Sequence, residues 1–330
     1  MNALRAVFAR REAGIFSMIV LFAIVVGIMR PRFLTFDELR IILLLVPLIL
    51  IGAMGEMLVI VARHVDLSIG STQAFAAIVI GMMFKFMPFV PWPVGFVVAI
   101  GVGAALGLAN GALITIFRLP AIIVTLGTMN LYRGLTFIVS NAKQIDRQYI
   151  PMGVKAMSTS SPAFNIPWIV FIALGVALLT YWFANHTRVG RQVFALGSNP
   201  VAAPLRGIRV TAVTLMVFTI SGALAGLSGL LYASRWGFVN PSNTGAGFEF
   251  QVIAAVVIGG VSINGGVGSV LGVVLGVLLM GCVSAALPLL SIPGAAQSAI
   301  YGAVIIIALL IDRSVRQRGI AALARQRARA

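Results

Sequence analysis

The chain has 330 residues, of which 60% are hydrophobic and only 10% are charged, and its mean hydropathy is +1.06. A soluble domain carries about a quarter charged residues, so this composition excludes a water-facing globular protein and indicates lipid as the main solvent. The net charge of +16 does not indicate a nucleic-acid partner, because the basic residues lie between long apolar runs rather than on one soluble face.

Apolar segments of membrane-crossing length recur along the whole chain. A crossing helix needs about 20 apolar residues. The candidate segments are 13–29, 41–62, 67–84, 86–117, 119–140, 156–187, 210–234, 250–262, 268–286 and 297–311. The segment 250–262 is short and ends in glycines, which favours a broken or re-entrant helix over a full crossing. We therefore expect a polytopic all-α membrane protein, a single permease domain (1–330) with about ten transmembrane helices.

The distribution of arginine and lysine predicts the orientation of these spans. If the N-terminus lies inside, most of the 24 basic residues fall on the cytoplasmic side. This places the short basic tails, 1–12 and 312–330, and the loop 185–210 in the cytoplasm. The expected location is therefore the bacterial inner membrane, with several crossings and with both termini cytoplasmic.

A polar stretch separates the second apolar segment from the third. Glu56 lies inside the segment 41–62, and Asp66 and Ser68 follow Arg63 just before the next segment. Charged residues in or beside spans are costly and therefore need a reason. One interpretation is a broken helix, capped by Asp66 and Ser68, that lines a translocation pathway. The alternative is a tight inner hairpin in which Arg63 and Asp66 pair at the headgroup level.

A second polar and glycine-rich stretch covers residues 237–249. Glycines at this density let backbones approach closely or break a helix. Glu249 is an isolated acidic residue in this part of the chain. It either gates the pathway or pairs with Arg235, and structural pairing is the favoured interpretation.

The loop 185–210 is the longest on the predicted cytoplasmic side. Asn199 is expected to cap a short helix that Pro200 begins and Gly207 ends. A short helix between two spans suits docking to a cytosolic protein, and the alternative is an ordinary connector held at the membrane by its arginines. The residues expected at the docking contact are Asn199, Pro200, Ala202, Ala203, Arg206 and Gly207.

No catalytic or metal-binding constellation emerges from the sequence. The two histidines, His64 and His186, have no companion at metal-ligand spacing, and the lone Cys282 excludes a disulfide framework. The glycine-rich stretches 101–111 and 222–229 lack the Lys and Thr of a phosphate loop, so helix packing explains them. We expect a protein that is not an enzyme and that binds no metal or cofactor of its own.

The two halves of the chain show a similar arrangement. Residues 40–140 and 210–311 each contain about four spans and one interrupted junction, at 64–71 and 259–268. The first half starts outside and the second inside. This pattern resembles the inverted repeats of transporters.

Several motifs resemble the permease subunits of ribose-type carbohydrate ABC importers, in the same order and over nearly the whole length. These motifs are Val65–Ser71, Leu119–Thr128 with Tyr132-Arg133-Gly134, Thr187–Arg191, Leu196–Ala203 through Gly207-Ile208, and Ala254–Ser262 with Gly265-Gly266. Arg63-His64 departs from the pattern, because many members of the family have two glycines there. This departure and the segment 119–134 look more like the permeases for rhamnose or the autoinducer sugar.

The resemblance implies a machine with several partners. A second permease subunit, the same or a different chain, pairs with this one over two cytosolic ATPases, and a periplasmic binding protein delivers the sugar. The loop 185–210 corresponds to the coupling helix, and ATP and Mg bind the ATPase. The substrate implied is a monosaccharide, such as rhamnose, the autoinducer sugar or a ribose-like sugar. Side chains expected along its route are Glu56, Asp66, Ser68, Asn130, Arg133, Asn243 and Glu249.

Two alternatives stay open. Branched-chain amino acid ABC permeases have similar hydropathy and similar glycine-rich segments, although the Asp66 motif favours a sugar. A standalone ion-coupled carrier or channel would use Glu56, Asp66 and Glu249 as coupling carboxylates. The docking-type loop favours the ATP-driven importer over the standalone carrier.

Overall fold

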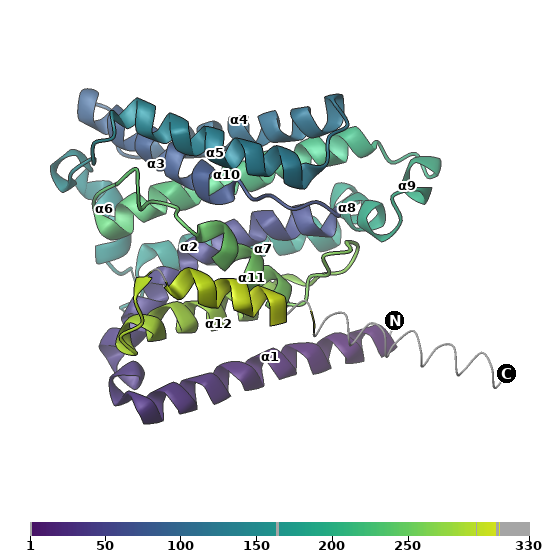
Figure 1. Cartoon of the computed structure of the whole chain (residues 1–330), viewed down its shortest axis with the longest axis horizontal. Coiled ribbons are helices and arrows are strands. Elements are labelled where there is room, and N and C mark those ends of the chain that lie inside the picture. The colour runs from purple at the N-terminus through teal and green to yellow at the C-terminus, as the bar shows by residue number, and fades with distance from the viewer. Residues whose placement is uncertain (1, 163–164, 295, 308–309, 311–330) are drawn as a thin grey trace.

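The computed structural model describes residues 2–162, 165–294, 296–307 and 310, with side chains from residue 12 onward. Within these ranges the chain is a helix bundle without β-strands, and Ile145 and Val239 form an isolated antiparallel bridge (Figure 1). The helices are α1 (Asn2–Met29), η1 (Pro31–Leu34), α2 (Phe36–Val61), α3 (Ile69–Phe86), α4 (Val94–Ile116), α5 (Ala121–Ser140), η2 (Arg147–Tyr149), α6 (Met152–Thr159), α7 (Trp168–His186), α8 (Arg188–Ser198), α9 (Ala202–Leu205), α10 (Val210–Trp236), α11 (Phe248–Ile258), α12 (Val270–Leu289) and Ala296–Ile307. The predicted tail 312–330 lies outside the described residues.

Eight of these helices are long and apolar enough to cross a membrane, namely α1 from Glu12 onward, α2, α3, α4, α5, α7, α10 and α12. The two shorter apolar helices, α11 and Ala296–Ile307, lie in the remaining expected segments. The structure thus confirms a polytopic all-α membrane protein, and α11 is the short piece expected at 250–262. The expected segment 86–117 yields α4 only from Val94, because prolines occupy positions 88, 91 and 93. The expected segment 156–187 is divided between α6 and α7.

Proline and glycine set several of the helix boundaries. Pro93, Pro120 and Pro167 immediately precede α4, α5 and α7, where a fixed φ and a missing N–H suit the start of a helix. Gly237 ends α10 with a φ of 71°, a left-handed conformation that glycine adopts without strain. The prolines and glycines that were visible in the sequence therefore fix where the spans begin and end.

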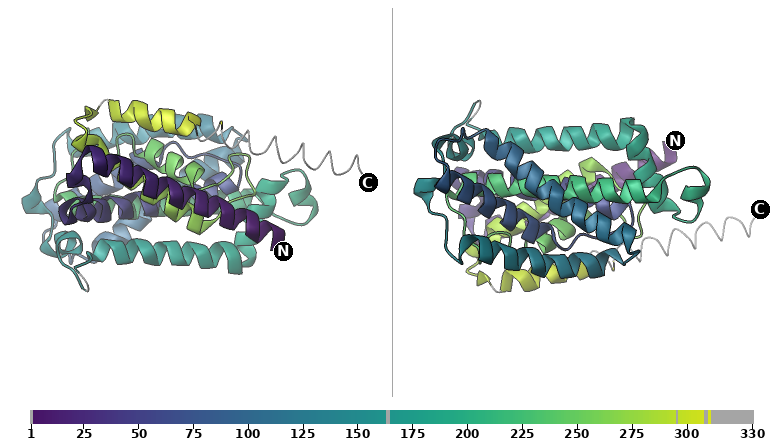
Figure 2. Two further views of the ribbon diagram at one scale, coloured as in Figure 1. Left: turned by 90° about the horizontal axis from the view of Figure 1, so that it is seen from below. Right: turned by 90° about the horizontal axis from the view of Figure 1, so that it is seen from above.

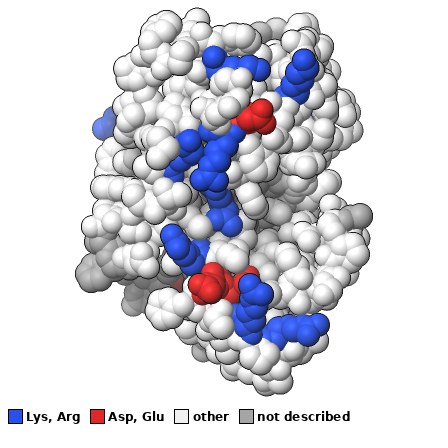
Figure 3. Space-filling view, turned by 90° about the vertical axis from the view of Figure 1, so that its left-hand side faces the viewer, with Lys and Arg blue, Asp and Glu red and all other residues white. Residues whose placement is uncertain are grey.

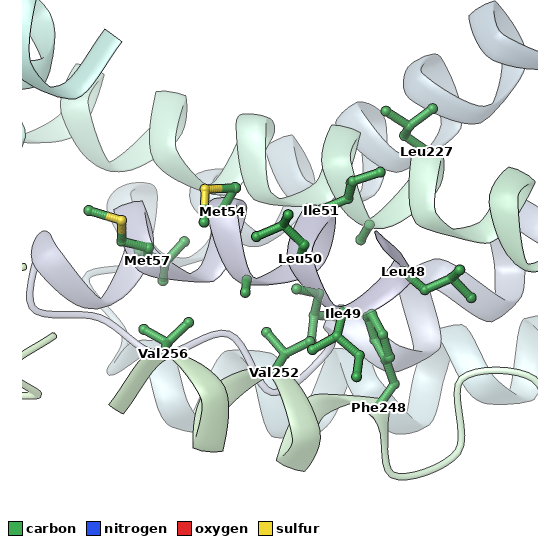
Figure 4. Close-up of a cluster of buried hydrophobic side chains, with 14 of the residues drawn as sticks. Leu48, Ile49, Leu50, Ile51, Met54, Met57, Leu227, Phe248, Val252 and Val256 are labelled. Atoms are coloured by element: carbon green, nitrogen blue, oxygen red, sulfur yellow. The ribbon is translucent and has the colours of Figure 1, made fainter. Parts of the chain in front are cut away.

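Helix α2 forms the centre of the bundle, and α1 lies on its outside. In the most apolar window of each helix, 83% of the residues of α2 are buried but only 17% of those of α1. The apolar side chains of α2, among them Leu50 and Met54, pack between Leu227 of α10 and Val252 of α11 (Figure 4). Seen from below, α1 crosses the bundle obliquely at its surface (Figure 2). Burial of apolar side chains from several helices around α2 holds the described core together.

Helices α4 and α10 approach each other so closely that their backbones touch. A Cβ atom added to Gly107 of α4 would meet the carbonyl oxygen of Phe218 in α10, and one added to Gly222 of α10 would meet that of Gly103. Small residues permit this kind of close helix packing in membranes. The helix-packing interpretation of the glycine-rich stretches 101–111 and 222–229 is therefore confirmed.

Candidate functional site

Two interrupted helices meet inside the bundle. The first, α3, follows the irregular segment 62–68, and the second, α11, follows the irregular segment 237–247. Their first turns are in contact, because a Cβ added to Gly70 would lie 2.5 Å from the carbonyl oxygen of Gly245 and would also meet the carboxylate of Glu249. Irregular backbone at this depth is tolerated only where it is buried in protein or lines a cavity.

The two helices run from this meeting point toward opposite ends of the bundle. Toward its C-terminal end, α3 reaches Ile145, since a Cβ at Gly81 would lie 3.1 Å from that side chain. Beyond the end of α11, Gly265 lies beside Arg63 and Gly197 at the end that carries α8 and α9. The interruption before α11 is therefore 237–247, whereas 259–268, which we expected to be the junction of the second half, is the loop between α11 and α12. Both helix N-termini, with their partial positive charges, point at the middle of the bundle.

A buried hydrogen-bond network surrounds the start of α3. Glu56 Oε1 accepts a hydrogen bond of 3.1 Å from the backbone N–H of Asp66. Asp66 Oδ1 accepts from the N–H of Ser68 at 2.9 Å and from its hydroxyl at 2.6 Å. The structure therefore brings these three predicted residues together. Ser68 occupies the N-cap position but makes no side-chain cap to α3, because its hydroxyl is turned to Asp66.

Three further side chains extend this network, and the sequence analysis did not assign them to the site. Asn110 of α4 donates to Ser68 Oγ at 2.8 Å, and Tyr132 of α5 donates to Asn110 Oδ1 at 3.0 Å. Ser221 of α10 donates to Asp66 Oδ2 at 3.5 Å. Asn110 is a polar amide inside a span without charged residues, and this feature could have identified it from the sequence as a candidate site residue.

Arg63 and Asp66 do not pair, so the ion pair proposed in the hairpin interpretation of this stretch is wrong. Asp66 is buried in the network, whereas the side chain of Arg63 is exposed. The backbone of Arg63 is left-handed, with a φ of 70°. His64, between the spans that end at Val61 and begin at Ile69, packs against Phe218 with the two rings tilted by 47°, and it contacts Thr214 Oγ1 through Nε2 at 3.3 Å. Burial lowers the pKa of His64 and therefore favours the neutral ring.

Arg133 of α5 holds the segment that leads into α11. It donates to the carbonyl oxygen of Thr244 at 2.6 Å and to that of Pro241 at 3.4 Å. Its charge acts on Glu249, in the first turn of α11. The pairing of Glu249 with Arg235 that we favoured from the sequence is not formed, because Arg235 stacks on Trp236 instead, with 5.1 Å between its guanidinium carbon and the ring centre. Arg133 and Glu249 thus form the charged part of the meeting point.

The remaining two predicted pathway residues lie apart from these groups. Asn130 is exposed on α5, where its amide donates to the carbonyl oxygen of Leu126 on the same helix. Asn243 is exposed in the segment before α11. Neither is brought into the buried network.

The loop 185–210 forms helices α8 and α9 at one end of the bundle (Figure 1). Asn199 Oδ1 accepts hydrogen bonds from the backbone N–H groups of Val201 and Ala202, as expected of a cap, and the helix begins at Ala202 rather than at Pro200. Gly207, with a φ of 76°, follows it. Ala203 is buried, while Val201 and Leu205 are among the most exposed apolar side chains of the described chain.

The end of α8 contacts two other parts of the chain: the end of α2, just before the segment that leads into α3, and the loop after α11. Gly197 packs on the carbonyl oxygen of Val61 at the end of α2, and the N–H of Gly266, in the loop after α11, donates to the same oxygen at 2.9 Å. A Cβ at Gly265 would lie 3.0 Å from Gly197. We call Val61, Gly197, Gly265 and Gly266 the α8 junction. It links the loop 185–210 directly to the segments that precede α3 and follow α11.

The described side chains offer no metal centre, since no three His, Cys, Asp or Glu residues among them gather closely enough. The site is instead a meeting of helix ends with carboxylates, hydroxyls and one guanidinium. Such groups can exchange hydrogen bonds with a polar solute without any covalent step.

Comparison with known proteins decides the family. Residues 39–309 match the family described as the permease component of branched-chain amino acid transport systems. The chain belongs to this permease family. It is therefore a multi-pass membrane protein and a transport component.

Individual relatives are permeases of one import system. This permease is 34% identical over 307 residues to the "Autoinducer 2 import system permease protein LsrC" of Salmonella typhi, covering 93% of this chain and 86% of the relative. The protein of the same name from Enterobacter sp. (strain 638) is 33% identical over 315 residues, covering 95% of this chain and 90% of the relative. These relatives confirm the resemblance to carbohydrate importer permeases that the motifs indicated. No solved structure matches the permease.

Proposed function

We propose that this chain is the membrane-spanning subunit of a bacterial ATP-driven importer that carries a small sugar, of the autoinducer-2 class, from the periplasm to the cytoplasm. The observation that carries the proposal is the similarity, over nearly the whole chain, to permeases named for autoinducer-2 import. The arrangement of α3 and α11 agrees with it, because interrupted helices that meet at mid-depth are the usual binding place of secondary transporters. An uncharged polyol needs the hydrogen-bonding groups found there rather than a permanent ion-pair partner.

Uptake by whole cells tests this function. Deleting the gene for this chain should abolish uptake of labelled autoinducer-2 while uptake of labelled leucine continues, and depleting ATP should give the same loss in the parent strain. Labelled ribose and rhamnose distinguish the sugars. Loss of leucine uptake alone would instead support a branched-chain amino acid permease, in keeping with the family description. Sugar uptake that persists without ATP would support a standalone carrier.

The charges and the fold support one orientation in the membrane. The end that carries α8 and α9 also holds Arg63, Arg118, Arg188, Arg191, Arg206 and Arg209. Helix α1 starts at this end, where Ser269 donates a hydrogen bond of 2.8 Å to Glu12. Positively charged loops favour the cytoplasmic side. We propose that this end and both termini face the cytoplasm, in the bacterial inner membrane.

The opposite end, which carries α6, then faces the periplasm. Figure 3 shows this end, and lysine and arginine side chains run across it with few acidic ones between them. The residues that lie there include Arg30, Arg32, Lys85, Lys143, Arg147 and Lys155. A sugar-binding protein with an acidic rim fits such a surface, because complementary charge steers association. A second permease, the same or a different chain, completes the proposed route within the lipid.

Helices α8 and α9 are the proposed contact with a cytosolic ATPase, which would bind ATP and Mg itself. Val201 and Leu205, 80% and 86% exposed, project from this loop without partners in the described chain. Exposed apolar residues on a short capped helix suit a protein contact. Ala203 supports the loop from within, because it is buried and its carbonyl oxygen accepts from the N–H groups of Arg206 and Ile208.

Leu205→Glu is expected to abolish association with the ATPase while membrane insertion stays normal. A charge at the centre of an apolar contact is desolvated without a partner, which weakens binding by about 2–5 kcal/mol. The measurement is co-purification of the tagged permease from detergent-solubilised native membranes, with mass spectrometry of the bound proteins. Leu205→Met is the control and should keep the ATPase. Equal recovery of the ATPase with both variants would show that α9 is an ordinary connector.

A further inference from the structure

Two carboxyl groups contact the same short stretch of backbone before α3, and neither has a cationic partner. Glu56 is 0% and Asp66 1% exposed, and Glu56 Oε1 lies 3.1 Å from the backbone nitrogen of Asp66. Among the side chains that the structure describes, no Lys, Arg or His nitrogen lies within 4.0 Å of an oxygen of either group. A buried carboxylate without a cation or sufficient donors is strongly disfavoured.

The two groups differ in the donors that they receive. Asp66 accepts from the N–H of Ser68, from the hydroxyl of Ser68 and from the hydroxyl of Ser221, and it lies at the positive end of α3. Within the described part of the chain, Glu56 receives only the N–H of Asp66, and its second oxygen, Oε2, is buried there without a hydrogen-bond partner. Because the donors favour the ionised form of Asp66, Glu56 is the group that is more easily held neutral.

Within the described residues, the surrounding helices contribute no charged side chain that would change which of the two carboxyl groups is held neutral. Asn110 of α4 and Ser221 of α10 face the network and do not titrate, and Tyr132 of α5 reaches it through Asn110. Two other titratable groups lie near the start of α3, namely His64, which contacts Thr214, and Glu249, whose carboxylate lies against Gly70 and interacts with the charge of Arg133. Glu56 and Asp66 are therefore each other's main electrostatic neighbours.

We propose that Glu56 and Asp66 form a proton-binding site that holds one proton, on Glu56, while Asp66 stays ionised. The pair then carries a single negative charge, which faces the N-terminus of α3. Neutral Glu56 still accepts the hydrogen bond from Asp66 through Oε1, so protonation keeps the observed geometry. A metal cation fits less well, because among the described side chains no third carboxyl, imidazole or thiol group gathers with these two, and bound metal ions require more oxygen ligands.

Infrared spectroscopy of the full-length purified permease tests the proposal, because it separates the carbonyl band of a protonated carboxyl group from the bands of an ionised one. Glu56→Gln should remove one protonated-carboxyl band at neutral pH and should leave the thermal midpoint unchanged, since glutamine mimics the neutral acid. Glu38→Gln is the matched control, because Glu38 is a buried glutamate in the first turn of the same helix. That variant should leave the Glu56 band in place.

Two further measurements show how the proposal would fail. Glu56→Leu removes the acceptor for the N–H of Asp66, so it should lower the thermal midpoint, whereas Glu56→Gln should not. If glutamine lowers the midpoint as much as leucine does and no carboxyl band is lost, Glu56 is ionised and the proposal is wrong. If sodium chloride, compared with choline chloride, stabilises the parent protein but not Glu56→Gln, the site binds a metal cation rather than a proton.

Discussion

Gly107→Val is expected to lower the apparent Tm of the purified permease by roughly 5 °C or more. A Cβ at this position would meet the carbonyl oxygen of Phe218, which is part of the backbone of α10 and cannot rotate away. The helices α4 and α10 must therefore move apart, and overpacking of this kind costs about 1–3 kcal/mol, with larger values where the backbone itself has to shift. Thermal unfolding in detergent, followed by the loss of monodisperse protein, measures the effect.

Gly101→Val is the matched control for that substitution. Gly101 lies on the same helix, but no atom lies within 4 Å of the Cβ that would be added, and the residue is exposed. The change in helix propensity is similar for both variants, so the difference between them isolates the contact with α10. If both variants unfolded at the temperature of the parent protein, the close approach of α4 and α10 would not exist in the membrane protein.

Gly197→Ala is expected to uncouple ATP hydrolysis from sugar uptake. The added methyl group would strike the carbonyl oxygen of Val61 and compete with the hydrogen bond that this oxygen accepts from Gly266. The end of α8 must then move away from Val61, while the exposed apolar residues of α9 stay available to the proposed ATPase. We expect normal co-purification, continued ATP hydrolysis and uptake reduced on the order of tenfold, which corresponds to about 1.4 kcal/mol in the barrier.

Two comparisons make this expectation specific. Gly175→Ala, in α7, adds a methyl group where no atom lies within 4 Å, so it should leave uptake unchanged. Measuring hydrolysis and uptake in the same reconstituted preparation separates uncoupling from loss of assembly. A Gly197→Ala variant with normal uptake would show that the α8 junction does not transmit movement to α3 and α11. If hydrolysis and uptake were both lost, the substitution would have broken the assembly instead.

The sequence predicted the elements of the fold well because each span carries its own signal. The long uncharged runs and the short glycine-ended piece at α11 are local features. The prolines before α4 and α7 are local too, but the expected segments 86–117 and 156–187 ran across them and so began too early. The spacing of small residues predicted close helix packing at 101–111 and 222–229, because such residues let helix backbones touch, but it did not predict that α4 and α10 are each other's partners. The cap at Asn199 was likewise local, since its partners lie two and three residues further along the chain.

The partners of the buried polar groups could not be predicted in the same way. Arg235 and Glu249 lie close together in the sequence, yet the charge that acts on Glu249 is that of Arg133, from another helix. The reason is that the segment 237–247 folds back into the bundle. Asp66 likewise meets Ser221, 155 residues further on. A lone polar residue in a span indicates that a partner exists, but only the packing of the helices selects which one.

The shortness of α11 has a consequence for how the protein is made. Its 11 residues cover about 16 Å, roughly half of the hydrocarbon thickness, so the segment cannot enter the bilayer as a span in its own right. In the folded protein it packs mainly against α2, made much earlier, and α12, made immediately afterwards, with a smaller contact to α3. Biosynthesis must therefore hold the stretch from residue 237 to residue 258 outside the lipid until α12 has emerged from the ribosome.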